Sequence, residues 1–265
     1  MDRWRGKRAL ITGASAGIGW ELAKLLAAGG TNLVLTARRR ERLEQLAAEL
    51  KSKNDIQVEI VTADLAHPAA PHDIRAFTSA KNLEIDLLIN NAGFGVYGAF
   101  HSAPVDRQAE MVQVNCSAVV ALTHLYLPDM VQRRRGDVLI LASVAGFQAV
   151  PYIATYAATK AFDLLFAEAI AEEVRPFGIN VCALCPGSTT TEFQQVAGQP
   201  DRAFRHAETA EKVARVGLEA LANGKSYVIS GLGNYASTQS QRLVPRRFVT
   251  RVAAKMFAPP EGQKP

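Results

Sequence analysis

The chain has 265 residues, 48% of them hydrophobic, and a mean hydropathy of +0.01, so it can bury the core of one large domain over residues 1–265 and is not a disordered protein. Its net charge of +5 and isoelectric point near 9.2 would allow binding to nucleic acid. No recognition motif supports such binding, and we expect no nucleic-acid partner. No apolar run reaches the roughly 18 residues of a membrane span, and the basic start MDRWRGKRALITG lacks a separate cleavage site.

Apolar runs of strand length recur along the chain, with stretches of helical spacing between them. They are RALIT at 8–12, TNLVLTA at 31–37, IQVEIVTA at 56–63, IDLLINNAG at 85–93, DVLILASVAG at 137–146, INVCALCPG at 179–187 and YVIS at 227–230. In the stretch after the second run, Leu43, Leu46, Ala47 and Leu50 recur at the spacing of one helix face. This alternation predicts a single-domain α/β Rossmann fold, a doubly wound parallel sheet of about seven strands with helices on both faces.

Three glycines follow the first strand, Gly13, Gly17 and Gly19 in TGASAGIG. Glycine allows a sharp turn and lets the backbone approach a ligand closely. A helix that starts there presents free amides and the positive end of its dipole, which suit a pyrophosphate. The spacing GxxxGxG differs from the general GxGxxG fingerprint, so a simple turn remains the alternative.

The second strand ends in Arg38-Arg39-Arg40 and carries no acidic residue there. An NAD-binding fold places Asp or Glu at this position on the ribose hydroxyls, whereas an arginine accommodates the 2′-phosphate of NADP. Cations at a helix start oppose the helix dipole, which favours a functional explanation over a solvated basic patch. We therefore predict NADP(H) as the cofactor, with Arg38 as the phosphate ligand and Arg39 beside it.

Tyr156 and Lys160 lie four residues apart in a segment that reads as a helix, so they share one face. A phenol with a pKa of about 10 is a poor acid at neutral pH. A positive charge about 4 Å away contributes roughly 4 kcal/mol at an effective dielectric near 20, which is nearly three pKa units. We therefore expect Lys160 to bring the pKa of Tyr156 close to the working pH.

Ser143 ends the strand DVLILAS, at the edge where a parallel sheet presents side chains to ligands. Its hydroxyl could hold a substrate oxygen. The GxSxG elbow of serine hydrolases is absent and no suitably placed histidine follows, which excludes nucleophilic catalysis by this serine.

The three cysteines are Cys116, Cys182 and Cys185, too few for a disulfide framework. Cys182 and Cys185 have CxxC spacing but lie in a strand-like run with no second ligand pair, so we interpret them as buried apolar residues and expect no metal site. Reduced cysteines and the lack of a membrane span favour a cytoplasmic location.

The ordered motifs resemble the short-chain dehydrogenase/reductase family over nearly the whole chain. The motifs are TGASAGIG at 12–19, Asp64-Leu65, Asn90-Asn91-Ala92-Gly93, Asn115 in VNCSA, Ser143, Tyr156-x-x-x-Lys160 and Pro186-Gly187. The resemblance implies that Tyr156 exchanges the proton of the substrate oxygen, that Ser143 hydrogen-bonds this oxygen, and that Lys160 lowers the pKa of the tyrosine and binds the nicotinamide ribose. It implies that Asn115 anchors a water relay through its helix.

The resemblance also implies which residues bind the cofactor. Besides Tyr156 and Lys160 they are Gly13, Ser15, Gly17, Ile18, Gly19, Arg38, Arg39, Asp64, Leu65, Asn91, Ala92, Gly93, Pro186, Gly187, Thr189 and Thr191, the two threonines near the carboxamide. A homodimer or homotetramer built on the helices that flank the sheet is expected by resemblance alone.

NADPH is the usual cellular reductant, so we expect reduction of a carbonyl to an alcohol. The predicted pocket mouth is apolar and favours a hydrophobic ketone or aldehyde, acyl or steroid-like. Its residues are Phe94, Val96, Tyr97, Phe100, Phe147, Val150, Tyr152, Ile153 and the stretch from Phe193, within a substrate-loop region at 186–225. The alternative is a protein that binds or senses NADP(H) without turnover, for which a catalytic tyrosine and lysine would serve no purpose.

The tail at 239–265 reads as a basic amphipathic helix. Its apolar stripe consists of Phe248, Val249, Val252, Ala253, Met256 and Phe257, with Arg246, Arg247, Arg251 and Lys255 largely elsewhere. An anionic membrane surface and a partner subunit are the alternatives, and we expect packing against its own domain.

Overall fold

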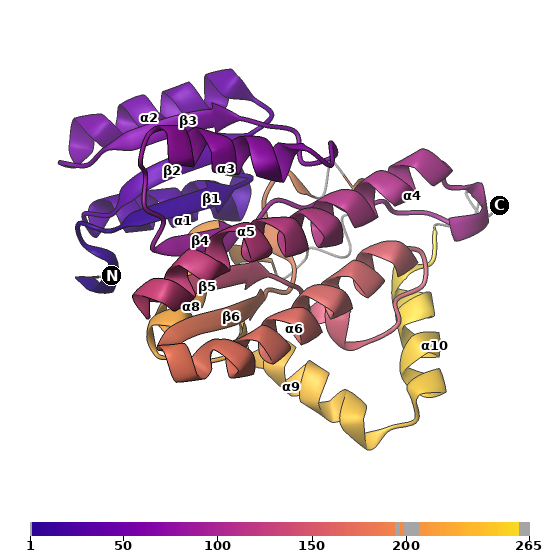
Figure 1. Cartoon of the computed structure of the whole chain (residues 1–265). Helices are drawn as coiled ribbons and strands as arrows, with labels where there is room; N and C mark the ends of the chain where they lie inside the picture. The colour runs from indigo at the N-terminus through magenta and orange to yellow at the C-terminus, as the bar shows by residue number, and fades with distance from the viewer. Residues whose placement is uncertain (1, 194–196, 199–206, 260–265) are drawn as a thin grey trace.

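A parallel sheet of seven strands forms the centre of the computed structural model, which describes residues 2–193, 197–198 and 207–259 (Figure 1). The strand order is β3-β2-β1-β4-β5-β6-β9, and every neighbouring pair is parallel. The strands are β1 (Arg8–Thr12), β2 (Asn32–Ala37), β3 (Val58–Thr62), β4 (Leu87–Asn90), β5 (Gly136–Leu141), β6 (Ile179–Cys185) and β9 (Tyr227–Ile229), and β7 (Thr189–Thr190) pairs with β8 (Glu208–Thr209) apart from them. The predicted doubly wound Rossmann fold is confirmed.

Helices cover both faces of the sheet. They are α1 (Gly17–Ala28), α2 (Arg40–Lys53), α3 (Ala70–Ala80), α4 (Val105–Val112), α5 (Ala118–Arg133), α6 (Ala154–Val174), α8 (Ala210–Ala222), α9 (Leu232–Ser240) and α10 (Arg246–Phe257). Shorter turns are η1 (Asp2–Trp4), η2 (Phe100–Ser102), the π-helical η3 (Gln113–Ser117), η4 (Val144–Phe147), η5 (Arg175–Phe177) and η7 (Gln241–Leu243).

The core is divided into two layers because successive strand side chains point to opposite faces. Ile11 packs into the cluster beneath α1, α2 and α8, whereas Leu10 packs into the cluster beneath α3, α5 and α6. The predicted apolar face of the helix at 40–53 is its buried face. Near-continuous apolar strands therefore reflect burial on both sides.

Cys182 and Cys185 are both buried in β6 but belong to different core layers. Residues three apart in a strand face opposite sides, so the two thiols do not converge on one ligand. Burial raises the pKa of Cys182 to about 12. The interpretation of these cysteines as buried apolar residues is confirmed.

One helical stretch among the described residues, Val105–Arg133, is 29 residues long and apolar enough to cross a membrane by length and composition. The expectation that nothing in the chain reaches this measure is wrong. The stretch comprises α4, η3 and α5, and its buried side chains, such as Met111 and Leu122, pack in the core layer beside α3 and α6. A helix that packs one side against the sheet can thus be as long and as apolar as a membrane-spanning helix.

The sheet changes its winding direction between β1 and β4. From β1 the chain adds β2 and β3 on one side, and from β4 it adds β5, β6 and β9 on the other. In such sheets the loops at the carboxyl ends diverge at the reversal and leave a crevice for ligands. The loops after β1, β4 and β5 carry the glycine turn, Asn91 and Ser143.

Candidate active site

A cavity of about 440 Å³ lies at the carboxyl ends of the strands. All the predicted site residues except Gly19 and Asn115 line it. From the first half of the chain these are Gly13, Ser15, Gly17, Ile18, Arg38, Arg39, Asp64, Leu65, Asn91, Ala92 and Gly93, and from the second half Ser143, Tyr156, Lys160, Pro186, Gly187, Thr189 and Thr191. Residues far apart in the sequence thus meet at one crevice.

The glycine turn is packed too tightly for side chains. Gly13 has φ +66°, and a Cβ there would lie 2.8 Å from Nδ2 of Asn91 and 2.9 Å from Cα of Ala92. A Cβ on Gly19 would lie 2.5 Å from the carbonyl oxygen of Gly13, so Gly19 serves close packing behind the cavity. Asn91 braces the turn by donating to the carbonyl of Thr12 at 2.8 Å.

Helix α1 begins at Gly17 on the cavity wall. The residue before it, Ala16, has no side chain that could accept from the first amides of the helix. These amides and the positive end of the helix dipole therefore face the cavity without an internal anion. The arrangement suits a phosphate group.

Arg38 and Arg39 stand exposed beside this helix start. The Nε of Arg39 donates to the hydroxyl of Ser15 at 3.3 Å, and its Nη1 lies 2.8 Å from a carboxylate oxygen of Glu192. Glu192 comes from the other side of the cavity, in the segment after Pro186, and sequence reasoning missed it. Asp64 accepts from the amide of Ala66 at 3.0 Å and so shapes the loop after β3.

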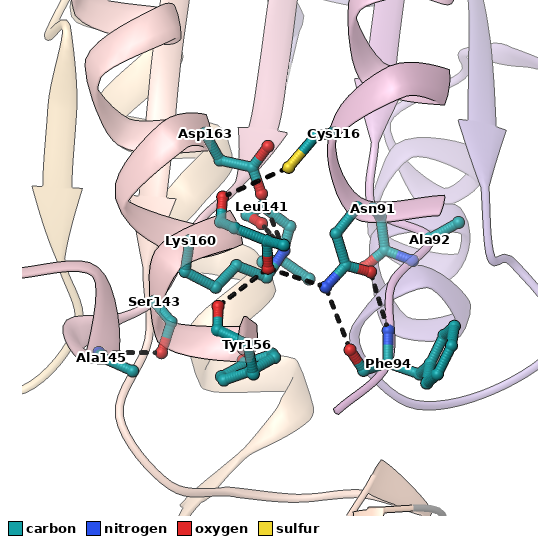
Figure 2. A network of polar contacts seen from close by, with 12 residues as sticks. Asn91, Ala92, Phe94, Cys116, Leu141, Ser143, Ala145, Tyr156, Lys160 and Asp163 are labelled. Carbon is teal, nitrogen blue, oxygen red and sulfur yellow. Dashed lines mark hydrogen bonds and ion pairs between the residues drawn. The ribbon is translucent and has the colours of Figure 1, made fainter. Parts of the chain in front are cut away.

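Tyr156 and Lys160 lie on successive turns of α6, and Asp163 follows one turn further (Figure 2). The ammonium of Lys160 is 6.0 Å from the centre of the Tyr156 ring. It donates to the carbonyl of Leu141 at 2.6 Å and to Oδ2 of Asp163 at 2.9 Å. Both charged residues are buried, Asp163 completely. Sequence reasoning missed Asp163, because an i, i+3 ion pair on a helix reads as a surface pair.

The pKa of Tyr156 lies above its usual value, because burial of the phenol outweighs the attraction of Lys160 and the hydrogen bond of Ser143, and Asp163 adds to the rise. The expectation that Lys160 brings this pKa close to the working pH is therefore not met in this structure. Burial also opposes the charge of Lys160, but Asp163 and Tyr156 offset it and the pKa of Lys160 is raised. The lysine is thus a fixed cation beside a protonated phenol.

Ser143 lies just after β5 and begins the turn η4. Its hydroxyl accepts from the amide of Ala145 at 3.1 Å and donates to the carbonyl of Pro186 at 3.4 Å. The side chain is nearly buried and lines the cavity beside Tyr156. These contacts fix the orientation of the hydroxyl.

Asn115 sits behind the cavity in the π-helical turn η3. Its Oδ1 accepts from the amide of Phe94 at 3.1 Å, and its Nδ2 donates to the carbonyl of Phe94 at 3.0 Å and to the hydroxyl of Thr159 at 3.0 Å. Both the oxygen and the nitrogen of the Asn115 side-chain amide are therefore engaged in hydrogen bonds. Asn115 therefore joins the loop after β4 to α6, and π turns of this kind are frequent at functional sites.

Apolar side chains form part of the cavity lining, here termed the apolar wall. Of the predicted mouth residues, Phe94, Ile153 and Phe193 line it, and the rings of Phe193 and Tyr156 are 5.2 Å apart. Phe257 of α10 also lines it, which sequence reasoning missed. Six other residues predicted at the pocket mouth do not line the cavity. They are Val96, Tyr97, Phe100, Phe147, Val150 and Tyr152. Residues 194–196 and 199–206 of the predicted substrate-loop region lie outside the described residues.

The family model for short chain dehydrogenases matches residues 7–202. The chain is 35% identical over 198 residues to a very-long-chain 3-oxoacyl-CoA reductase of Phaeosphaeria nodorum, covering 72% of this chain and 58% of the relative. It is 31% identical over 265 residues to dehydrogenase/reductase SDR family member 7B of Xenopus tropicalis, covering 93% of this chain and 84% of the relative. The chain thus spans little more than half the length of the first of these relatives.

Solved structures are similar over most of the chain. A short-chain dehydrogenase from Sphingobium yanoikuyae in complex with NADPH has a TM-score of 0.82 and 30% identity, over 89% of this chain and 93% of that one. A short chain dehydrogenase/reductase from Burkholderia phymatum in complex with NAD has a TM-score of 0.83 and 25% identity, over 92% of this chain and 95% of that one. Structures of this kind therefore hold either nicotinamide cofactor.

The prediction of a cytoplasmic location is wrong. One matched relative is named for very-long-chain 3-oxoacyl-CoA, and acyl chains favour a bilayer because each buried CH₂ contributes about 0.8 kcal/mol. The stretch Val105–Arg133 also has the length and composition of a membrane span, although its side chains such as Met111 and Leu122 pack in the core. A cytoplasmic location inferred only from reduced cysteines and interrupted apolar runs therefore does not stand.

Proposed function

The chain belongs to the short-chain dehydrogenase family and is an oxidoreductase, and from this premise we propose that it uses NADPH to reduce a hydrophobic ketone or aldehyde to an alcohol. One observation carries the proposal. Ser143, Tyr156 and Lys160 line one cavity together with the glycine turn after β1 and an apolar wall.

The residues of the cavity fit a dinucleotide. The turn at Gly13 leaves no room for side chains, and the first turn of α1 offers amides without an internal acceptor. In this proposal the turn and α1 hold the pyrophosphate, Asp64, Leu65, Asn91, Ala92 and Gly93 line the nucleoside, and Pro186, Gly187, Thr189 and Thr191 lie near the carboxamide. Bound NADPH supplies the hydride, and the protein supplies position and a proton.

Tyr156 is the proton donor in this mechanism. Reduction of a carbonyl leaves charge on its oxygen, and a protonated phenol next to that oxygen can neutralise it. The raised pKa of Tyr156, caused chiefly by burial, keeps the phenol protonated at neutral pH. This state suits reduction, whereas oxidation would first need the phenol to lose its proton.

Ser143 and Lys160 support this transfer. The amide of Ala145 holds the Ser143 oxygen, and the hydroxyl can exchange its 3.4 Å bond to the carbonyl of Pro186 for a bond to the substrate oxygen, which would polarise the carbonyl. The ammonium of Lys160 stabilises the phenolate that remains after Tyr156 donates its proton. Asn115 takes part indirectly, since its contacts to Phe94 and Thr159 hold the loop after β4 against α6. A water relay through its helix would return a proton to Tyr156.

A 3-oxoacyl thioester is the substrate class that we favour. Phe94, Phe193 and Phe257 line the cavity and would hold a hydrocarbon chain beside the reacting carbonyl. The relatives named for very-long-chain 3-oxoacyl-CoA support this choice over a steroid-like ketone.

NADPH is preferred over NADH in this proposal because two arginines and no acidic side chain follow β2 at the cavity edge. Arg38 would bind the 2′-phosphate. Arg39 would assist it by exchanging its ion pair with Glu192 for the phosphate, which is the stronger anion. The related structure in complex with NADPH supports this preference.

Self-association is part of the proposal. Phe162 and Leu165 of α6 and Val120 of α5 are exposed apolar side chains on helices that flank the sheet. Such a face suits burial against a second copy. Sedimentation of the wild type and of Leu165→Asp would test it, with a smaller assembly expected for the variant.

The alternative function is binding or sensing of NADP(H) without turnover. Following NADPH absorbance with 3-oxoacyl thioesters of increasing chain length, and with steroid, sugar and aromatic carbonyls, separates the two functions. We expect oxidation of NADPH with the acyl thioesters. Tight NADPH binding with no turnover across the whole panel would favour the alternative.

A further inference from the structure

The end of the chain carries an exposed surface that the proposed chemistry does not use. The segment Leu232–Phe257, here termed the arm, follows β9 and consists of α9, η7 and α10; α9 runs outward and α10 turns back toward the domain (Figure 1). Leu232 is 90% exposed, Leu243 86% and Met256 64%. Apolar side chains exposed to this degree in one segment mark an interaction surface.

Residues spaced four apart form a row along one side of a helix, and three of the four such rows of α10 concern this surface. The inner row is Val249, Ala253 and Phe257, of which Ala253 is buried and the others are partly buried. The outer apolar row is Phe248, Val252 and Met256, all exposed. The basic row, on the far side of the outer apolar row, is Arg247, Arg251 and Lys255, also exposed.

The inner row fixes the rotation of α10. Ala253 packs in a cluster with Ile153 and Ala157, and the hydroxyl of Tyr97 donates to the carbonyl of Phe257 at 2.7 Å. Since these contacts hold one side of the helix against the domain, the outer apolar row cannot turn inward. The predicted packing of the tail on its own domain therefore accounts for only half of its apolar stripe.

All the charged side chains of the arm are positive. Between Leu232 and Pro259 the sequence contains no Asp or Glu and five cations, Arg242, Arg246, Arg247, Arg251 and Lys255. Within the part of the chain that the structure describes, none of the five forms an ion pair with a carboxylate. Their charge is available to an anionic partner.

We propose that the arm docks on an anionic lipid bilayer, with the outer apolar row of α10 entering the interface and the basic row contacting lipid headgroups. A helix with an apolar side and flanking cations is suited to lie in the plane of a membrane surface. A second copy of the chain is the poorer fit, because a symmetric contact between two arms would bring like charges together.

Docking in this way would bring the bilayer to the edge of the active-site cavity. Phe257 belongs to the inner row of α10 and lines the cavity, so the membrane would lie one helix away from the apolar wall. An acyl substrate could then pass from the bilayer to the cavity, a consequence that rests on the proposed function. The docking itself does not, and it is measured without turnover.

Cosedimentation of the full chain with vesicles tests the proposal. One set contains equal parts phosphatidylcholine and phosphatidylserine, and the other phosphatidylcholine alone. We expect the wild type to pellet only with the anionic vesicles. The basic-row variant R247Q/R251Q/K255Q should bind them roughly 100-fold more weakly, since each cation near an anionic surface contributes about fivefold. The apolar-row variant F248S/V252S/M256S should lose at least roughly tenfold.

The matched control is K51Q/K53Q/K81Q, which removes the same charge from α2 and the end of α3, next to the opposite edge strand of the sheet. It should bind like the wild type. Equal loss in the control would overturn the proposal, because binding would then follow net charge alone. Failure of the wild type to bind either vesicle, together with a smaller assembly for the apolar-row variant, would assign the arm to a subunit contact instead.

Discussion

The ammonium of Lys160 lies 2.9 Å from Oδ2 of Asp163, one turn further along α6, and both side chains are buried. The cation that should stabilise a Tyr156 phenolate is therefore already paired with a carboxylate. Asp163 raises the pKa of Tyr156 and helps to keep Lys160 charged. It is a positioning residue for the proposed mechanism rather than a group that touches substrate.

Asp163→Asn should shift the pH dependence of reduction. Asn keeps the shape and can still accept from Lys160, but it removes the negative charge that raises the pKa of Tyr156. The phenol would then lose its proton at lower pH, so the alkaline fall in the reduction rate should begin at lower pH than in the wild type. The profile of kcat/KM against pH measures this.

The control for that profile is Asp129→Asn on α5, which removes a carboxylate paired with Arg75 on the partly exposed surface. Its profile should match the wild type. An alkaline limb in Asp163→Asn that stays in place or moves to higher pH would refute the assigned role of Asp163.

The buried pair should also couple in stability. Lys160→Met leaves the Asp163 carboxylate buried without its cation, and Asp163→Leu leaves the Lys160 ammonium with only the Leu141 carbonyl. Each change should lower the free energy of unfolding by about 3–5 kcal/mol, whereas K160M/D163L should lose much less than the sum. Urea unfolding of the four proteins measures the coupling, and strictly additive losses would exclude it.

Arg38→Asp should move the cofactor preference toward NADH. The variant loses the proposed partner of the 2′-phosphate and gains an acceptor for ribose hydroxyls. We expect kcat/KM for NADPH to fall roughly 10- to 100-fold, the range for losing a charged hydrogen bond. Arg40→Asp is the matched control, since Arg40 pairs with Glu44 on the surface of α2. A variant at position 38 that still strongly prefers NADPH would remove Arg38 from the phosphate site.

Phe193→Ala should discriminate between substrates by chain length. The ring of Phe193 lies 5.2 Å from that of Tyr156 and forms part of the apolar wall. Loss of a buried aromatic contact costs about 1.5–3 kcal/mol, so KM for long acyl thioesters should rise roughly 10- to 100-fold. KM for the shortest thioester should change little, and an equal rise for all lengths would show that Phe193 does not contact the chain.

Local features of the site could be predicted from the sequence, because they depend on neighbouring residues. Gly13 marks a turn with positive φ, and four-residue spacing alone places Tyr156 and Lys160 on one face of a helix. The end of a parallel strand likewise identifies Ser143. Each of these positions follows from the residue spacing within a single turn, helix or strand.

Features that depend on burial or on distant segments could not be predicted. Asp163 follows Lys160 at the spacing of a surface ion pair, and only the tertiary packing of α6, whose contacts include β5 and β6, buries it. Phe257 reaches the cavity from the far end of the chain. The pKa of Tyr156 departs from the expected direction for the same reason, since the sequence reveals the lysine but neither the burial of the phenol nor the carboxylate behind the lysine.

Single-turnover reduction by Tyr156→Phe tests the central claim, that this phenol donates the proton. Phe keeps the ring beside Phe193 and removes only the hydroxyl. With NADPH bound and an acyl ketone in excess, the rate should fall by roughly 10² to 10⁴, the usual contribution of a general acid, while the Kd for NADPH stays within a few fold. A variant that turns over at the rate of the wild type would show that the proton comes from another group.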